Sequence, residues 1–170
     1  MYPTNVIIAL GTNLGNFKIN FQNALGEIAK FSKITTIGNI YISKPYGFKN
    51  QNNFHNTAIE ILTNHQPLQL LKKIESIENK LMKNKKIING PRIIDLDIIF
   101  FGNKIIKCSQ LEIPHPQAIN RDFVLKPIFD IRPFYKDPLT KLSIKELLNS
   151  INSYYIIKSL NSSYLGKKFF

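Results

Sequence analysis

Apolar residues along the first part of the chain follow two different periods. Residues 6–10 are a short, wholly apolar run, which is typical of a buried strand. The apolar positions after the next loop recur every three or four residues, which is the period of an amphipathic helix: Leu14, Phe17, Phe21, Leu25 and Ile28. Asn16 is a suitable N-cap for this helix, because its side chain can accept backbone N–H bonds. The segment predicts a strand followed by a helix.

The middle of the chain predicts two more strands and a second helix. Residues 34–42 and 54–62 alternate polar and apolar positions, as strands do, and we expect the two to pair. Residues 66–86 return to helical spacing and end in a lysine-rich stretch. The second helix therefore follows a pair of strands.

The segment after this helix predicts a strand and a hairpin. Residues 90–101 contain a long apolar stretch, which we interpret as a strand. Gly102 and Asn103 are typical turn residues and predict a hairpin that continues into residues 104–106.

The last third of the chain carries weaker signals. Pro116 is a suitable first residue of a helix. Ser143 and Glu146 match a capping box, which predicts a last helix. After Ser153 the chain is rich in Ser, Asn, Tyr and Lys, and we expect its end to be loose.

The predicted order of elements indicates the fold class. Strand, helix, strand, strand, helix, strand is the order of a ferredoxin-like α+β fold, a mostly antiparallel sheet covered by helices. We expect residues 1–160 to form a single domain and residues 161–170 a loose tail. The apolar runs are too short for a signal peptide or a membrane span, so we expect a cytoplasmic protein without a membrane partner.

Two carboxylates, Asp95 and Asp97, stand one residue apart in the apolar segment 90–101. On a strand such side chains share a face and lie roughly 6 to 7 Å apart. The opposite face is expected to hold four apolar side chains: Ile94, Leu96, Ile98 and Phe100. Burying two like charges side by side is costly unless a cation lies between them, and magnesium prefers oxygen ligands. The alternative is a strand whose polar face meets water.

The basic composition points to an anionic partner. The formal net charge is +12, which suits either nucleic acid or a polyphosphate. Only three of the 23 lysine and arginine residues are arginine, so the charge reflects lysine enrichment as much as one basic surface. Arg92 and Arg121 stand out, because a guanidinium offers phosphate two parallel N–H donors. An ordinary surface arginine is the alternative for each.

Other classes of partner find little support. RNA-binding modules of similar topology pair strand aromatics with basic residues and glycine, and this chain has no such segment. We therefore expect no nucleic-acid partner. The single cysteine, Cys108, excludes an internal disulfide, and the histidines at 55, 65 and 115 lack zinc-ligand spacing. We expect a monomer that binds small molecules.

Four short motifs follow one another along the chain. Residues 90–97 read Gly-Pro-Arg-Ile-Ile-Asp-Leu-Asp, and residues 114–123 contain Pro-His-Pro and Asn-Arg-Asp-Phe. Residues 9–15 read Ala-Leu-Gly-Thr-Asn-Leu-Gly, and residues 45–56 contain Pro-Tyr-Gly and Phe-His-Asn. Together the motifs resemble those of the 6-hydroxymethyl-7,8-dihydropterin pyrophosphokinase family over most of the chain.

This resemblance implies a reaction and its catalytic residues. The family transfers the terminal diphosphate of ATP to the hydroxymethyl oxygen of a reduced pterin and releases AMP, a step of folate biosynthesis. By similarity, Asp95 and Asp97 hold two magnesium ions that bridge the triphosphate. The remaining catalytic residues implied are Arg92, His115, Arg121 and Lys83. Arg92, His115 and Arg121 would bind phosphate oxygens, with His115 just before the expected helix start.

The resemblance also implies a pterin pocket. Phe54 and Phe123 match an aromatic pair that stacks on the flat ring, and Asn56 matches the amide that reads the pterin edge. Further substrate contacts are implied for Ser43, Lys44, Tyr46 and Asp95. Core packing is the ordinary alternative for either phenylalanine alone.

One segment departs from the family pattern. The family usually carries Gly-Arg-x-Arg at the end of the second helix, whereas residues 82–85 read Met-Lys-Asn-Lys. Lys83 and Lys85 keep positive charge without guanidinium geometry, so we expect reduced turnover in place of inactivity. Lys85 and Glu75 are expected near ATP, and a solvated helix face is the alternative for Glu75.

Three hypotheses about function remain open from sequence. The first is the pterin pyrophosphokinase, which forms AMP only with the pterin present. The second is a related phosphoryl-transfer enzyme that acts on another small alcohol and leaves ADP if one phosphate moves. The third is a basic binding module whose affinity falls steeply with salt and does not depend on Asp95 and Asp97. The resemblance favours the first.

Overall fold

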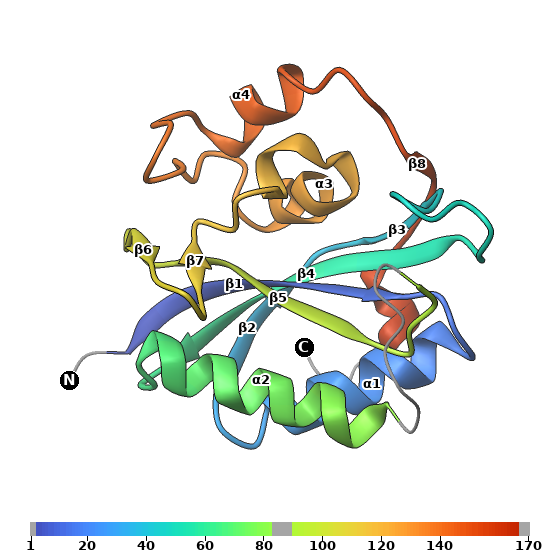
Figure 1. Cartoon of the computed structure of the whole chain (residues 1–170), viewed down its shortest axis with the longest axis horizontal. Helices are drawn as coiled ribbons and strands as arrows, with labels where there is room; N and C mark the ends of the chain where they lie inside the picture. Colours follow the sequence, from blue (N-terminus) through green and yellow to red (C-terminus); the bar gives the residue numbers. More distant parts are fainter. Residues whose placement is uncertain (1–2, 83–89, 167–170) are drawn as a thin grey trace.

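The computed structural model describes residues 3–82 and 90–166 as an antiparallel sheet between two layers of helices (Figure 1). The strands are β1 (Thr4–Thr12), β2 (Lys33–Ile37), β3 (Ile40–Ser43), β4 (Phe54–Thr63), β5 (Asp95–Phe101), β6 (Ile106–Lys107), β7 (Glu112–Ile113) and β8 (Ile156–Leu160). The helices are α1 (Phe17–Ile28), α2 (Pro67–Leu81), α3 (Asp122–Ile131) and α4 (Ile144–Asn149), with 3-10 helices η1 (Ala118–Asn120) and η2 (Ser162–Leu165).

The main sheet has the order β5-β1-β4-β3-β8, and β2 also pairs with β4. All these pairings are antiparallel. The chain order of β1, α1, the β2/β3 segment, β4, α2 and β5 places β1 and β4 in the centre and β5 at an edge. The predicted ferredoxin-like α+β fold is therefore confirmed.

Helices cover both faces of the sheet, and each face has its own core (Figure 1). Side chains of β1 alternate between the two: Val6, Ile8 and Leu10 pack in the core under α1 and α2, and Ile7 and Ala9 in the core under α3 and α4. Burial on both faces explains why this strand reads as a continuous apolar run. No helix within the described ranges combines the length and the apolarity needed to cross a bilayer.

The first helix forms as its sequence predicts. Asn16 accepts backbone N–H bonds from Lys18 and Ile19 and so caps α1. Leu14 lies outside the helix and is exposed. The second helix follows the pattern from Pro67 to Leu81, and the lysine-rich end of the predicted helix lies outside the described residues.

The single strand predicted over residues 34–42 is wrong, because the structure divides it into β2 and β3. The break lies at Gly38, where α3 approaches so closely that an added Cβ would be 2.5 Å from the Pro127 carbonyl oxygen. The Gly38 N–H donates to the Ala58 carbonyl, and its own carbonyl accepts the Thr57 hydroxyl. Both strands pair with β4, as expected for this segment.

The predicted alternation along β5 holds only as far as Ile98. The register with β1 shifts between Ile7 and Ile8, so that β5 has one extra residue there. Ile99 and Phe100 consequently both belong to the core under α3, and Phe101 returns to the core under α1 and α2. The expectation that Phe100 shares a face with Leu96 is wrong for this reason.

The predicted hairpin into residues 104–106 is also wrong. A turn does form, since the Lys104 N–H donates to the Phe101 carbonyl. The strand that follows, β6, pairs with β7 instead of β5. The helix expected at Pro116 begins only at Asp122, after the short helix η1.

The C-terminal segment is part of the folded structure up to residue 166. The capping box of Ser143 and Glu146 begins α4 as predicted. Strand β8 pairs with β3, and Leu165 of η2 is fully buried while its carbonyl accepts the Gln22 side-chain amide. The loose end expected after Ser153 is therefore wrong for this part of the chain, and residues 167–170 lie outside the described residues.

Burial of Leu165 predicts a measurable contribution to stability. Leu165→Ala should lower the free energy of unfolding by about 2 kcal/mol or more, because it leaves a cavity in the core. The neighbouring Tyr164→Ala, at a side chain that is 55% exposed, should change it by less than about 0.5 kcal/mol. Urea unfolding of both variants checks this, and equal effects would contradict the packing of η2.

Candidate active site

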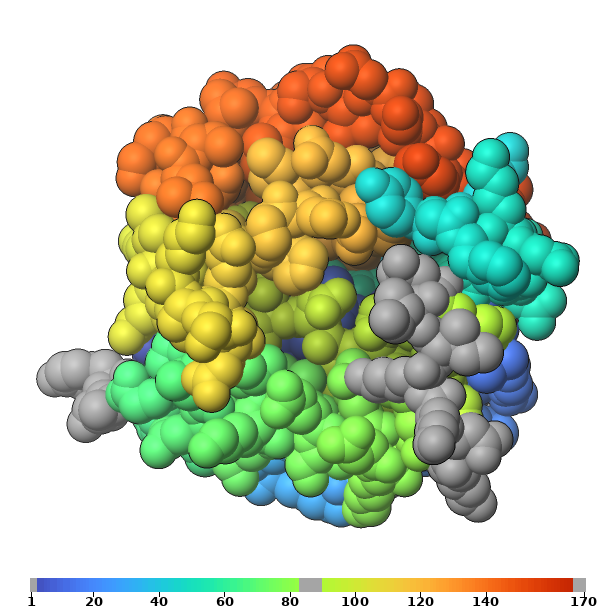
Figure 2. Space-filling model, viewed as in Figure 1, coloured from blue at the N-terminus to red at the C-terminus, as the bar shows by residue number. Residues whose placement is uncertain are grey.

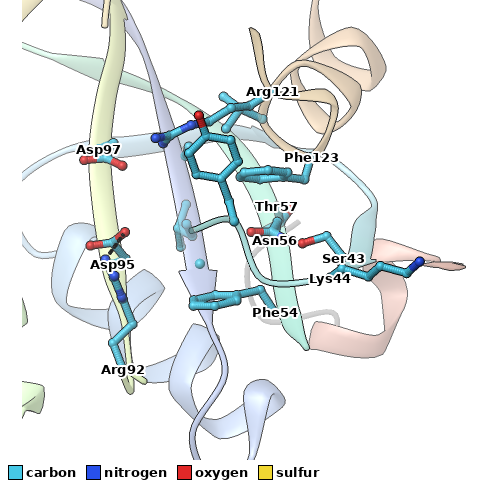
Figure 3. A pocket seen from close by; sticks show the side chains of 15 residues that line it. Ser43, Lys44, Phe54, Asn56, Thr57, Arg92, Asp95, Asp97, Arg121 and Phe123 are labelled. Atoms are coloured by element: carbon cyan, nitrogen blue, oxygen red, sulfur yellow. Dashed lines mark hydrogen bonds and ion pairs between the residues drawn. The ribbon is translucent and has the colours of Figure 1, made fainter. Parts of the chain in front are cut away.

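A pocket opens on the face of the sheet that α3 covers, and most of the predicted site residues line it (Figure 3). In the space-filling view the surface is hollowed below α3, beside the side chains of β5 (Figure 2). Residues of β1 form part of the lining. The lining residues include Ser43, Lys44, Tyr46, Phe54, Asn56, Arg92, Asp95, Asp97, Arg121 and Phe123.

Strand β5 directs both acidic side chains into this pocket. Asp95 and Asp97 share a face, as predicted, because Leu96 between them packs in the core on the other side. Their partners across the sheet are Gly11 and Ala9, respectively. These small residues leave space beside the carboxylates, where larger side chains would fill the pocket.

The acidic pair is electrostatically unfavourable in the absence of a cation. Burial, followed by the nearby charges of Asp95 and Glu78, raises the pKa of Asp97 to about 7, although Arg121 and Arg92 oppose the shift. Glu78 comes from α2 and accepts the Leu96 N–H at 2.9 Å, so it covers the free edge of β5. Three carboxylates thus converge on one short stretch of strand.

Arg92 partly compensates this negative charge. Its Nη1 donates to Asp95 Oδ2 at 2.8 Å, and its Nε donates to the Gly90 carbonyl at 3.2 Å. The guanidinium also lies 5.8 Å from the centre of the Phe54 ring. Arg92 therefore occupies the space beside Asp95 where a ligand or cation would compete for the carboxylate (Figure 3).

Arg121 approaches the acids from the other side of the pocket (Figure 3). It immediately precedes α3, and its guanidinium lies 4.7 Å from the centre of the Tyr46 ring. Its Nη2 donates to Gln117, while its buried Nε has no hydrogen-bond partner within the described part of the chain. A buried donor of this kind is available to an anionic ligand.

His115 lies near Arg121 without lining the pocket. Burial and the Arg121 charge lower the pKa of His115, which favours the neutral ring. Its Nδ1 accepts the Gln117 N–H at 3.3 Å, so the proton of the neutral ring is on Nε2. His115 was expected just before a helix start, but Arg121 is the residue at that position.

Two aromatic rings form opposite walls of a flat space. Figure 3 shows Phe123 and Phe54 on either side, with Asp95 and Asp97 at one end and Asn56 and Ser43 at the other. The Asn56 amide nitrogen donates to the Tyr41 carbonyl and to Ser43 Oγ. Because the amide nitrogen is committed to these bonds, the Asn56 oxygen, Oδ1, is the atom available to a ligand. The space suits a planar heterocycle.

Asn13 is a positioning residue that we did not predict individually. Its Oδ1 accepts the Arg92 N–H at 2.8 Å, and its Nδ2 donates to Gln51 Oε1 and to the Asn52 carbonyl. It thereby joins three segments that are far apart in sequence. The motif at residues 9–15 contains it, so the signal was present, but its contacts depend on the fold.

The structure does not bring all predicted residues into the pocket. Glu75 is exposed on α2 and is not among the lining residues, and its place near ATP stays a prediction. Lys83 and Lys85 lie outside the described residues. Lys44 lines the pocket and is exposed. Within residues 3–82 and 90–166, no group of three or more His, Cys, Asp or Glu side chains has the arrangement of a metal site.

Comparison with protein families gives a match over most of the chain. The family model described as 7,8-dihydro-6-hydroxymethylpterin-pyrophosphokinase (HPPK) matches residues 7–133. This range contains every residue that we assigned to the pocket from sequence.

Curated relatives fall into two groups by length. A Pneumocystis carinii folic acid synthesis protein is 42% identical over 95% of this chain, which spans only 22% of that relative. The 2-amino-4-hydroxy-6-hydroxymethyldihydropteridine pyrophosphokinase of Haemophilus influenzae is 35% identical over 89% of this chain and 95% of its own length. The Aquifex aeolicus protein of the same name is 33% identical over 83% of this chain and 88% of its own.

A solved structure supports the fold. The Plasmodium falciparum HPPK-DHPS protein superimposes with a TM-score of 0.71 at 19% identity, covering 86% of this chain and 43% of that one. At this identity the likeness shows the fold alone.

Burial of Asp97 beside a second carboxylate predicts a pH-dependent cost to the stability of the metal-free protein. A carboxyl group with a raised pKa in the folded state stabilises the fold at low pH and loses that contribution as the pH rises through its folded pKa. The free energy of unfolding of the wild type should therefore fall between pH 5 and pH 8. After allowance for the partial exposure of Asp97, this fall should be about 2 kcal/mol larger than in Asp97→Asn. Urea unfolding in the presence of a chelator measures this, and parallel pH profiles would contradict it.

Proposed function

The chain belongs to the 7,8-dihydro-6-hydroxymethylpterin-pyrophosphokinase family, and we propose that it transfers the diphosphate of ATP to the hydroxymethyl oxygen of 6-hydroxymethyl-7,8-dihydropterin. AMP is the second product. The names of the relatives that match this chain over most of their own length support the assignment. Other relatives are much longer than this chain. We therefore assign this activity to the chain alone and infer nothing about further domains.

One observation carries the proposal. Asp95 and Asp97 face the same space as the flat slot between Phe54 and Phe123, and Arg92 and Arg121 flank them (Figure 3). A polyphosphate with its cations fits the charged end, and a planar acceptor fits the aromatic end. A basic binding module would have no use for two carboxylates at its centre.

The acidic pair suits magnesium. Its donors are hard carboxylate oxygens on one face of a rigid strand, and their repulsion disappears when a divalent cation binds. With two carboxylates from the chain, phosphate oxygens and water must complete the coordination, as is usual for magnesium in phosphoryl-transfer sites. We propose that Asp95 and Asp97 hold two magnesium ions, which when bound would neutralise the charge of the triphosphate.

The basic residues are assigned to the phosphates. Arg92 donates to Asp95 in this structure, and it would donate to a phosphate oxygen instead if Asp95 held a cation. Arg121, whose Nε has no hydrogen-bond partner among the described residues, is assigned to the same anion. His115 donates from Nε2, since its Nδ1 already accepts a backbone N–H.

The polar end of the slot is assigned to the pterin. The ring stacks between Phe54 and Phe123, and Asn56 accepts a ring N–H through Oδ1, because its amide nitrogen is already committed to Ser43 and Tyr41. This orientation directs the hydroxymethyl group toward the acidic end. Tyr46 and Lys44 close the slot from the segment after β3.

The reaction then depends mainly on alignment and charge. The pterin hydroxyl oxygen bonds to the β-phosphorus, the bond from that phosphorus to the α,β-bridging oxygen breaks, and AMP leaves with this oxygen. The hydroxyl proton is released to water, which balances the charges of AMP and the pterin diphosphate. Holding the two reactants in line supplies much of the rate. The reduced turnover, the monomeric state and the cytoplasmic location stay predictions.

Product analysis tests this function directly. AMP should form from ATP only when magnesium and the hydroxymethyl pterin are both present, and Asp97→Ala should lower kcat/KM by about 100- to 1000-fold because charge on the phosphates is no longer balanced. Chromatography of the nucleotides checks both expectations.

A matched control uses a carboxylate on the other face of the sheet. Glu27 on α1 forms ion pairs with Lys30 and Lys80 at 2.7 Å, so Glu27→Gln should keep full activity. Formation of ADP in place of AMP would contradict diphosphate transfer, and AMP formation without the pterin would contradict the proposed acceptor.

A further inference from the structure

The C-terminal part of the chain contributes an aromatic ring next to the pocket. Tyr155 comes immediately before β8, and its ring meets Tyr46 at 5.4 Å and Phe123 at 5.9 Å, in both cases edge to face. Tyr46 and Phe123 both line the pocket, and Tyr155 does not. The Tyr155 ring therefore supports two lining residues from behind.

Hydrogen bonds fix the backbone of this segment on both sides. The Tyr155 carbonyl accepts the Lys44 N–H at 2.9 Å, which ties it to the segment after β3. The buried Asp122 accepts the N–H groups of Tyr155 and Ile156 through Oδ2, at 2.8 and 3.0 Å, and the Phe123 N–H through Oδ1. Tyr155 is thus joined to both segments that carry the rings it touches.

This support comes from outside the part of the chain that the family model matches. That match ends at residue 133, whereas Tyr155 lies in the segment expected from sequence to be loose. The Tyr155 hydroxyl makes no hydrogen bond to any residue that the structure describes, so ring packing is its contribution. Edge-to-face pairs stabilise the relative orientation of aromatic rings.

We propose that Tyr155 is a positioning residue for pterin binding, which holds the Phe123 and Tyr46 rings at the angle that forms the slot. This inference rests on the proposed function. Without the Tyr155 ring, Phe123 and Tyr46 can turn into the space it vacates, and the slot no longer matches a planar ring. The phosphate end depends on Asp95, Asp97, Arg92 and Arg121. Tyr155 touches none of them and lies near Arg121 only through the Tyr46 and Phe123 rings that face its guanidinium.

The test separates pterin binding from nucleotide binding. With magnesium and saturating α,β-methylene ATP, which cannot release AMP, Tyr155→Ala should raise the Kd of 6-hydroxymethyl-7,8-dihydropterin about tenfold, as expected from the loss of two aromatic contacts. The Kd of the nucleotide analogue should change by less than twofold. In turnover, the KM for the pterin should rise with little change in kcat.

Three further variants serve as controls. Tyr155→Phe keeps the ring and should bind the pterin like the wild type, as should Tyr154→Ala, because the Tyr154 side chain is 71% exposed. Asp122→Asn keeps all the rings but weakens the anchoring of residues 155 and 156, so it should raise the pterin Kd about three- to fivefold. This variant decides the question if Tyr155→Ala does not fold.

The possible outcomes distinguish this inference from the function on which it rests. Wild-type pterin affinity in folded Tyr155→Ala, or an equal loss of affinity for pterin and nucleotide, would overturn the positioning role alone. Weak binding by Tyr155→Phe would overturn the argument from ring packing. Failure of the wild type to bind the pterin would overturn the proposed function and this inference with it.

Discussion

The structure depends on two carboxylates that one strand holds side by side. Asp95 and Asp97 cannot separate, because the pairing of β5 with β1 fixes their backbone and Leu96 is packed in the core between them. Burial and mutual repulsion raise the pKa of Asp97 to about 7. Arg92 and Arg121 reduce this repulsion without removing it, and a divalent cation would relieve the remainder. The sheet thus maintains an unfavourable charge arrangement that a metal-bound polyphosphate would relieve.

The remainder of the pocket comes from segments that lie far apart in sequence. Polar side chains join them by hydrogen bonds to backbone groups: Asn13 ties the loop after β1 to residues 52 and 92, and Asp122 ties the start of α3 to residues 155 and 156. Such bonds fix the backbone from which Arg92, Phe123 and Tyr155 project. The charged end is therefore built on a strand, and the aromatic end on loops and a helix start that need these links.

Sequence patterns predicted the features that depend on neighbouring residues alone. The alternation around Leu96 and the spacing of two aspartates were sufficient to place both carboxylates on one face of a strand, and motif resemblance identified most of the lining residues. Long-range packing decided the rest. Close approach of α3 at Gly38 split a strand, and an extra residue at Ile99 turned Phe100 to the other core. Strand β8 joined the sheet although it lies in a segment rich in Ser, Asn, Tyr and Lys. Tyr155 was missed because nothing near it in sequence indicates Phe123 as its neighbour.

The count of bound metal ions tests the central claim most directly. Manganese can replace magnesium and be counted by its paramagnetic signal, with the chain saturated by α,β-methylene ATP. The account predicts two ions for each wild-type chain and the loss of at least one in the Asp95→Asn, Asp97→Asn double variant. Equal numbers of ions in the two proteins would contradict it, because the nucleotide alone would then hold the metal.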